Sequence, residues 1–220
     1  MATLQLGILV SGSGTNLQAI LDAIARGELD ARVALVISNK PGAAAVERAR
    51  TAGVPVRVVP HKDFATRALF DQALVEALRE AGADWVVLAG FMRVLTSTLL
   101  EAFPMHVVNI HPALLPSFPG VDAQAQALAA GVRVTGCTVH LVDTGTDTGP
   151  IIAQAAVAVR QDDTRDSLAA RILVREHQLL VSVLRWISED RLSIEQASPG
   201  ARARVRLAGI NSALGVAEAL

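Results

Sequence analysis

The chain lacks most of the features that would mark a secreted, zinc-binding or membrane protein. A single cysteine, Cys137, excludes an internal disulfide and leaves a zinc site short of thiolate ligands. Its neighbours predict a strand, so we expect a buried and inert thiol there. No uncharged apolar stretch reaches the roughly 18 residues that a membrane span requires. The first residues also lack the basic and apolar segments of a signal peptide, so we expect a cytoplasmic protein.

Charge of either sign is also scarce. Charged residues make up 19% of the 220 residues, tyrosine is absent, and the formal net charge is −1. A near-neutral chain carries no general electrostatic footprint for nucleic acid or an anionic membrane, so we expect neither as a partner. Hydrophobic residues make up 51% of the chain, which indicates a globular protein with a full core.

The first half of the chain alternates apolar runs with amphipathic stretches. Strands that are apolar throughout and separated by helices predict a parallel sheet covered on both faces. The sequence predicts strands at 4–10, 32–38, 55–59, 85–89 and 106–110, and helices at 15–25, up to 52, 63–81 and 96–102.

The pattern changes after residue 110. A proline-rich loop and a helix at 121–130 precede two β-branched runs, 133–142 and 151–159, which no helix separates and which we expect to pair antiparallel. A long helix follows at 164–187, capped by Asp162, Asp163 or Thr164. The overall prediction is an α/β fold with a mostly parallel sheet, to which the C-terminal part adds antiparallel strands and a long helix. From Ser198 onward the chain is rich in Ala, Gly and Arg, and predicts a short strand at 203–207 or partial disorder.

The loop at residues 11–16 is a candidate anion site. It reads Ser-Gly-Ser-Gly-Thr-Asn and lies between a predicted strand and a predicted helix, where glycines and free N–H groups favour an anion. Leu17 replaces the third glycine of a dinucleotide fingerprint, and a phosphate-loop lysine is absent. A single phosphate therefore suits the loop better than a dinucleotide; the alternative is an ordinary capped turn.

Asn109 and His111 are candidate catalytic residues. They are two residues apart and face the same side of a predicted strand at its C-terminal end, where open parallel sheets bind ligands. Asparagine can donate to a developing oxyanion, and histidine can give or take a proton near neutral pH. The alternative is a hydrogen-bonded histidine that braces the proline-rich loop.

Asp147 lies in the small-residue loop 143–149, where Asp143 competes with it for any catalytic role. For either carboxylate alone, an ordinary turn residue is the simpler interpretation. His140 is expected on a strand at the rim of the site. Glu176 and His177 would normally form a solvated pair on the long helix.

Four segments together resemble the phosphoribosylglycinamide formyltransferase family. The segments are GSGTNLQAI at 12–20, LAGFMRVL at 88–95, NIHPALLP at 109–116 and DTGP at 147–150. They occur in the order seen in that family, and the similarity extends from about residue 4 to about residue 192. The resemblance implies a Rossmann-like fold in a single domain at 1–195. Its phosphate-binding half would cover about 1–103 and its folate and catalytic half about 104–195, with a tail at 196–220.

The resemblance also implies the roles of particular residues. The substrate would be glycinamide ribonucleotide, whose amine receives a formyl group from the co-substrate 10-formyltetrahydrofolate. The reaction would need no metal. The protein would be a monomer or a homodimer. The catalytic trio would be Asn109, His111 and Asp147. The substrate phosphate would bind at Gly14, Thr15 and Asn16, and the ribonucleotide would also touch Glu176. The folate pocket would be lined by Arg67, Met92, Arg93, Val94, Leu95 and Asn109.

This chemistry suits the trio. Attack of the amine on the formyl carbon creates a negative oxygen, which Asn109 and a protonated His111 would stabilise, and Asp147 would favour the imidazolium. The peptide between Leu115 and Pro116 is expected to be cis. Two positions depart from the family: Ser117 replaces a frequent basic residue, and Thr148 replaces a frequent glycine, which would stiffen the loop.

Four other functions compete with this interpretation. Formyltetrahydrofolate deformylase shares the trio but hydrolyses its substrate and usually carries an added N-terminal domain. Methionyl-tRNA formyltransferase would need a longer chain with an RNA-binding domain. A nucleotide-dependent oxidoreductase would need the full glycine fingerprint and an acid after the second strand. A non-catalytic folate- or phosphate-binding module would leave the trio unexplained.

Overall fold

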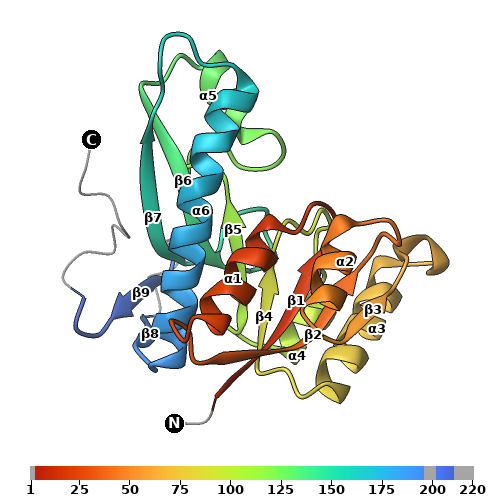
Figure 1. Cartoon of the computed structure of the whole chain (residues 1–220). Coiled ribbons are helices and arrows are strands. Elements are labelled where there is room, and N and C mark those ends of the chain that lie inside the picture. Colours follow the sequence, from red (N-terminus) through yellow and green to blue (C-terminus); the bar gives the residue numbers. More distant parts are fainter. Residues whose placement is uncertain (1–2, 196–201, 211–220) are drawn as a thin grey trace. The chain divides into compact units, whose positions relative to one another are not determined.

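The computed structural model describes residues 3–195 and 202–210 of the chain. Contacts divide the chain into two compact units, Met1–Asn109 and Ile110–Leu220. The elements of both units are labelled in Figure 1. In the described part of the chain, no helix has the length and apolar character needed to cross a membrane.

The first unit is built on parallel strands in the order β3-β2-β1-β4-β5, and it ends within β5, whose last two residues belong to the second unit. The strands are β1 (Leu4–Val10), β2 (Ala31–Ser38), β3 (Val56–Val58), β4 (Trp85–Leu88) and β5 (Val107–His111). All five had been predicted within two residues at each end, because continuous apolar runs are typical of strands that are covered on both faces.

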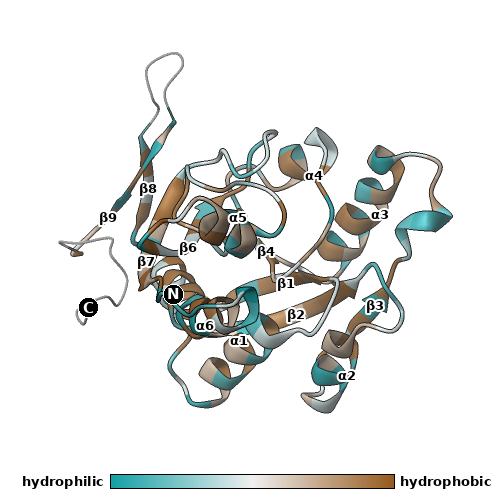
Figure 2. Ribbon diagram, turned by 90° about the horizontal axis from the view of Figure 1, so that it is seen from above, coloured by the Kyte–Doolittle hydropathy of each residue, from teal (hydrophilic) through white to brown (hydrophobic). Residues whose placement is uncertain are grey.

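Helices cover both faces of this parallel sheet. In Figure 2, α1 (Thr15–Ala25) and α2 (Ala44–Thr51) lie on one face, while α3 (Arg67–Glu80) and α4 (Ser97–Ala102) lie on the other. Each fully buried leucine or isoleucine contributes roughly 1.5–3 kcal/mol to the stability of this core. The largest such side chains in the first unit are Leu6, Ile8, Leu9, Leu17, Ile20, Ile37, Leu74, Leu78 and Leu99.

One helix begins later than predicted. The periodicity suggested 63–81, but a short 3-10 turn, His61–Asp63, precedes α3. Thr66 is the N-cap of α3, and its hydroxyl accepts a hydrogen bond from the backbone N–H of Leu69 at 3.2 Å. This cap fixes the start of the helix.

The second unit contains the antiparallel pair that the sequence predicted. β6 (Val134–Leu141) pairs with β7 (Ile151–Ala158), α6 (Arg165–Ser188) packs along both strands, and α5 (Ala123–Ala129) contacts α6. With the parallel strands and the long helix, this confirms the predicted α/β fold class. It is visible in Figure 1 that α6 runs alongside both strands.

A small hairpin follows α6. It consists of β8 (Leu192–Glu195) and β9 (Arg204–Leu207), and only β9 had been predicted. β8 has four partly or fully exposed residues, so its stability depends on pairing with a strand further along the chain rather than on a local pattern. Of the predicted tail, residues 196–201 and 211–220 lie outside the described residues.

The start of α6 carries a strong local charge interaction. Thr164 is the N-cap in a capping box with Ser167, and the side chain of the preceding Asp163 is 3% exposed. The Asp163 carboxylate accepts hydrogen bonds from the backbone N–H of Arg160 and the hydroxyl of Ser167, and pairs with the Arg171 guanidinium. The bond from Arg171 is the main cause that lowers the pKa of Asp163 to about 2.

Replacing Asp163 by Asn should therefore lower stability in a pH-dependent way. A lowered folded-state pKa stabilises the protein above the ordinary carboxyl range, and this contribution is lost as the pH falls toward about 2. We expect Tm near neutral pH to fall by roughly 3 °C. The difference from the unmodified protein should shrink between about pH 4 and pH 2 in thermal melts. Asp162→Asn, at the exposed neighbouring position, is the matched control; an equal fall there would contradict the assignment.

Candidate functional site

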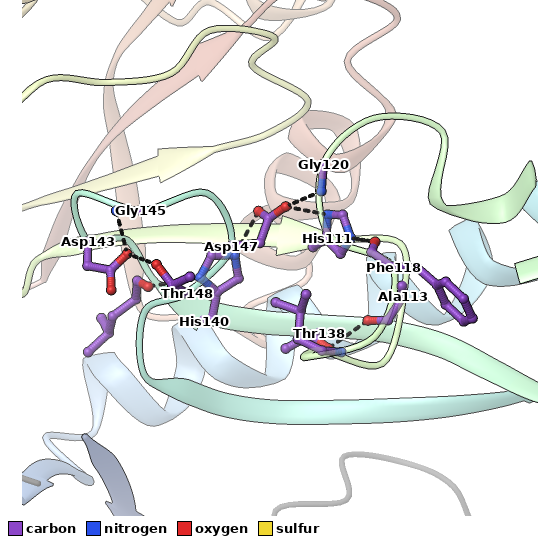
Figure 3. Close-up of polar contacts among 12 residues, drawn as sticks. His111, Ala113, Phe118, Gly120, Thr138, His140, Asp143, Gly145, Asp147 and Thr148 are labelled. Atoms are coloured by element: carbon purple, nitrogen blue, oxygen red, sulfur yellow. Dashed lines mark hydrogen bonds and ion pairs between the residues drawn. The ribbon is translucent and has the colours of Figure 1, made fainter. Parts of the chain in front are cut away.

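A histidine and a carboxylate meet in the second unit. His111 is the last residue of β5, and Asp147 lies in the loop between β6 and β7. The His111 Nδ1 atom is 3.4 Å from the Asp147 Oδ2 atom, and both side chains are largely buried. Figure 3 shows the two side chains pointing toward one another. The structure thus brings together two members of the predicted trio.

The second ring nitrogen of His111 also faces an acceptor. His111 Nε2 is 2.8 Å from the backbone oxygen of Phe118, in the proline-rich loop. A neutral imidazole can donate from only one ring nitrogen, whereas an imidazolium donates from both. Both ring nitrogens of His111 therefore lie near acceptors. This contact also agrees with the alternative expectation of a histidine that braces the loop.

A second histidine, His140, completes the cluster. It lies on β6 as predicted, is 2% exposed, and its Nδ1 is 2.8 Å from the backbone oxygen of Leu141. Its Nε2 is 3.6 Å from the other oxygen of Asp147, Oδ1. The sequence placed His140 only near the site; its contact with the carboxylate of Asp147 depends on a loop fold that local patterns do not encode.

Asp147 is held as a charged carboxylate. Burial alone would raise the pKa of Asp147, but the hydrogen bond from His140, the backbone N–H of Gly120 and the nearby charge of His111 outweigh it and lower that pKa. The Gly120 N–H donates to Asp147 Oδ2 at 2.8 Å. Asp147 has a φ of 56°, in the left-handed region that non-glycine residues rarely occupy. A negative group held beside His111 stabilises the imidazolium there.

The competing carboxylate, Asp143, serves its own loop. Asp143 Oδ1 accepts hydrogen bonds from the backbone N–H of Gly145 at 3.1 Å and from the hydroxyl of Thr148 at 2.6 Å. These bonds are typical of a turn residue. They also give Thr148, the departure from the family pattern, a partner within the loop. The geometry favours Asp147 over Asp143 as the partner of His111.

Buried polar groups shape the segment after His111. The Thr138 hydroxyl accepts from the backbone N–H of Leu115 at 3.0 Å and donates to the backbone oxygen of Ala113 at 2.7 Å. The Gln154 amide donates to the backbone oxygen of Leu115 at 2.9 Å. The peptide between Leu115 and Pro116 is cis, as predicted. Sequence reasoning missed Thr138 and Gln154, because an ordinary strand also contains such residues.

The candidate anion loop of the first unit, residues 11–16, leads directly into α1. Gly14, at φ 73°, is the N-cap of α1, and within the described residues no side chain caps this helix. A Cβ at Gly14 would lie 2.6 Å from the Cβ of Ala45, so the loop lies directly against α2. The Arg48 guanidinium donates to the backbone oxygen of Ser13 at 2.8 Å. Thr15 and Asn16 form the first turn of α1, where backbone N–H groups favour an anion.

Ser11 ties this loop to two other segments. Its hydroxyl donates to Asn39 Oδ1 at 2.7 Å and accepts from the backbone N–H of Met92 at 2.9 Å. Ser11 is 4% exposed. The sequence treated it only as part of the loop, whereas it links the loop to the end of β2 and to the segment that contains Met92.

The predicted folate segment, residues 92–95, presents apolar side chains at the surface. Met92 is 70% and Val94 is 52% exposed, whereas Leu95 is buried. Asp71 of α3 anchors the end of this segment, since its Oδ2 accepts from the backbone N–H of Thr96 at 2.5 Å and from the Thr96 hydroxyl at 2.7 Å.

Burial raises the pKa of Asp71, and the bonds from Thr96 with the charges of Arg67 and Arg93 offset part of that rise. Both arginines of the predicted pocket thus act on the carboxylate that anchors it. Asp71 is a further residue that sequence reasoning missed.

Two predicted residues lie on elements with little room for solvent. Asn109 is half-buried on β5, opposite Leu88 of β4, and lies on the same side of the strand as His111. Glu176 lies on α6 and is 7% exposed, so the expectation of a solvated Glu176–His177 pair is wrong. The reason is helical spacing, because Glu176 follows Ile172 by four residues on the buried face. Desolvation also lowers the pKa of His177.

A metal centre is not among the features of the described residues. No group of three or more His, Cys, Asp or Glu side chains in 3–195 and 202–210 has the arrangement to hold a metal ion. Cys137, predicted to be inert, is fully buried on β6, and burial raises the pKa of its thiol far above the usual range.

Comparison with known proteins relates this arrangement to one family. Residues 4–184 match the family described as formyl transferase. The crystal structure of glycinamide ribonucleotide transformylase 1 from Symbiobacterium toebii is 48% identical, with a TM-score of 0.89 and 94% of each chain covered.

Two relatives differ in how much of their own length the match covers. Phosphoribosylglycinamide formyltransferase of Bacillus subtilis is 42% identical over 180 residues, which are 82% of this chain and 92% of the relative. The trifunctional purine biosynthetic protein adenosine-3 of Drosophila melanogaster is 51% identical over 176 residues, which are 79% of this chain. The match spans 13% of that larger protein.

Proposed function

The chain belongs to the formyl transferase family, and from this premise we propose that it transfers the formyl group of 10-formyltetrahydrofolate to the amine of glycinamide ribonucleotide. The products would be formylglycinamide ribonucleotide and tetrahydrofolate, in the synthesis of purines. Similarity to separate proteins named for this activity, over more than nine-tenths of their length, supports the proposal.

The observation that carries the proposal is the pairing of His111 with Asp147. Both ring nitrogens of His111 face acceptors, and the carboxylate beside it is kept ionised by its lowered pKa. An imidazolium at the end of a strand is suited to stabilise a developing oxyanion. An ordinary turn aspartate is usually exposed and bonds to neighbouring backbone groups, whereas Asp147 is largely buried beside two histidines.

The proposed reaction starts with attack of the neutral substrate amine on the formyl carbon. A tetrahedral species forms, whose negative oxygen is stabilised by Asn109 and the protonated His111. Asp147 stabilises the imidazolium and helps an ordered water carry the proton from the attacking amine to N10 of the folate. The bond between N10 and the formyl carbon then breaks, which leaves the formyl group on the amine and releases tetrahydrofolate.

The remaining predicted residues would bind the two substrates. Gly14, Thr15 and Asn16 would hold the ribonucleotide phosphate at the start of α1. The folate would bind along residues 92–95, with Arg67 nearby and Asn109 reaching its formyl group, and the exposed apolar side chains of this segment support that role. Glu176 would contact the ribonucleotide, a role that rests on the family resemblance.

The deciding experiment measures release of tetrahydrofolate from 10-formyltetrahydrofolate by the purified protein, with and without glycinamide ribonucleotide. We expect release only when the ribonucleotide is present. Equal release without it would identify the hydrolytic alternative, a formyltetrahydrofolate deformylase. The absence of release under both conditions would contradict the assigned catalytic trio.

Replacing Gly14 by Ala should selectively weaken binding of the ribonucleotide. The new methyl group would lie 2.6 Å from the Cβ of Ala45 and would stand at a positive φ, so the loop must shift. We expect KM for the ribonucleotide to rise about 10-fold or more, and stability to fall by roughly 1–3 kcal/mol. KM for the folate should change little.

Gly12→Ala is the matched control in the same loop. A Cβ there meets nothing within 4 Å. Equal effects of the two substitutions on KM, or an equal rise in KM for the folate after Gly14→Ala, would remove the phosphate assignment.

A further inference from the structure

Asp147 also receives a contact on its main chain, from a distant part of the second unit. Arg202, which precedes β9, donates from its Nη2 atom to the backbone oxygen of Asp147 at 3.0 Å. The two residues are 55 positions apart in the sequence. The proposed catalytic carboxylate is therefore held by its main chain as well as by its side chain.

The surroundings of the Arg202 guanidinium are unusual for a charged group. Its Nη1 atom is buried and has no hydrogen-bond partner among the residues that the structure describes. Arg206 of the same hairpin, by contrast, is exposed and pairs with Glu195 of β8. Burying part of a guanidinium without a carboxylate is costly. That cost indicates that the contact with the Asp147 carbonyl has a purpose beyond stabilising the hairpin.

The Asp147 carbonyl is a sensitive point of the site. Asp147 has a φ of 56°, in the left-handed region, which L-residues other than asparagine and aspartate seldom adopt. Its carboxylate must meet Gly120 at 2.8 Å, His111 at 3.4 Å and His140 at 3.6 Å at the same time. A hydrogen bond to the Asp147 carbonyl restricts rotation of the peptide. It therefore restricts the position of the Asp147 Cα atom, from which the side chain extends.

We propose that Arg202 is a positioning residue for formyl transfer, which holds the carboxylate of Asp147 against His111 by binding the Asp147 main-chain carbonyl. The proposal rests on the proposed function for its kinetic consequences. Its structural consequence, a loop at 142–150 that is restrained by Arg202, does not depend on which reaction the protein catalyses.

Steady-state kinetics of Arg202→Ala test the kinetic consequence. We expect kcat to fall about 10-fold, because a small displacement of a catalytic group slows the chemical step, while KM for the ribonucleotide stays within about 2-fold. Arg202→Lys, which keeps one donor and the charge, should recover part of the loss. Arg206→Ala, which removes the ion pair of the hairpin but not this contact, should leave kcat unchanged. A lowered Tm with unchanged kcat in Arg202→Ala would overturn the proposal.

A double-mutant cycle with Asp147→Asn shows whether Arg202 acts through Asp147. In that background, Arg202→Ala should lower kcat by less than about 2-fold, because the group that it positions has already lost its charge. A full 10-fold loss in both backgrounds would overturn the proposal.

Hydrogen exchange of the loop at 142–150 separates this proposal from the proposed function. Arg202→Ala should speed exchange there relative to Arg206→Ala, whether or not the protein transfers formyl groups. Unmodified protein that produces no tetrahydrofolate would refute the function alone. Equal exchange in the two variants would refute the role of Arg202.

Discussion

Replacing Asp147 by Asn should lower kcat by about 10³-fold, while KM for the ribonucleotide changes by less than about 3-fold. The carboxylate oxygens of Asp147 accept from the backbone N–H of Gly120 and face one ring nitrogen each of His111 and His140. The asparagine side chain has only one accepting oxygen and carries no charge, so its NH2 group must face groups that the second carboxylate oxygen now faces. The imidazolium of His111 then loses its counter-charge, and the proton relay loses its base. The measurement is initial rates of tetrahydrofolate formation with each substrate varied.

Asp143→Asn is the matched control, because it changes a carboxylate of the same loop that bonds only to neighbouring loop groups in the described structure. We expect its kcat to stay within about 5-fold of the unmodified protein, since a turn residue contributes to loop stability rather than to the chemical step. A large rise in KM after Asp147→Asn with unchanged kcat would assign Asp147 to substrate binding instead. A larger fall in kcat after Asp143→Asn would move the catalytic role to Asp143.

The sequence predicted most of the fold because its signals are local. Continuous apolar runs identified β1, β2 and β4, and helical spacing identified α1 and α6. The paired β6 and β7 followed from two β-branched runs without a helix between them. β8 was missed because its pairing partner, rather than its own four residues, makes it a strand.

The site was predicted less completely, for a physical reason. Asn109 and His111 were candidates because they end a predicted strand and supply the chemistry of acyl transfer, whereas Asp147 was preferred over Asp143 only through the family resemblance. His140 was expected only at the rim of the site and Arg202 was not considered, because the contact of each with Asp147 forms only in the folded chain. Such residues resemble ordinary strand or surface residues until the contacts are known.

The same limitation applies to the residues that hold the two segments predicted to bind substrates. Ser11 binds Asn39 and Met92, and Asp71 binds Thr96, in each case across a long stretch of sequence. A serine after a strand and an aspartate in a helix have many ordinary explanations. The exposed apolar Met92 beside them was found only because the family resemblance pointed to its segment.

His111→Gln should reduce kcat by about 10²- to 10³-fold, the range typical of losing a donor that stabilises an oxyanion. Glutamine is polar and of similar length, but it cannot become a cation, and so it cannot stabilise the developing oxyanion with a full charge. His140→Gln should cost much less, about 10-fold, because His140 is bonded through Nδ1 to the Leu141 backbone and acts on the carboxylate alone. Single-turnover rates of formyl transfer with saturating substrates compare the two variants directly.

The double variant His111→Gln with Asp147→Asn then tests whether the pair works as one unit. If Asp147 acts mainly by stabilising the imidazolium, its charge has no use once the imidazole is gone, and the double variant should be within about 5-fold of the slower single variant. Losses that multiply fully would mean that Asp147 acts independently of His111, through the water that carries the proton to the folate. If His140→Gln lowered kcat as much as His111→Gln, the reacting formyl group would lie against β6 instead. A residue other than His111 would then have to be assigned as the oxyanion donor.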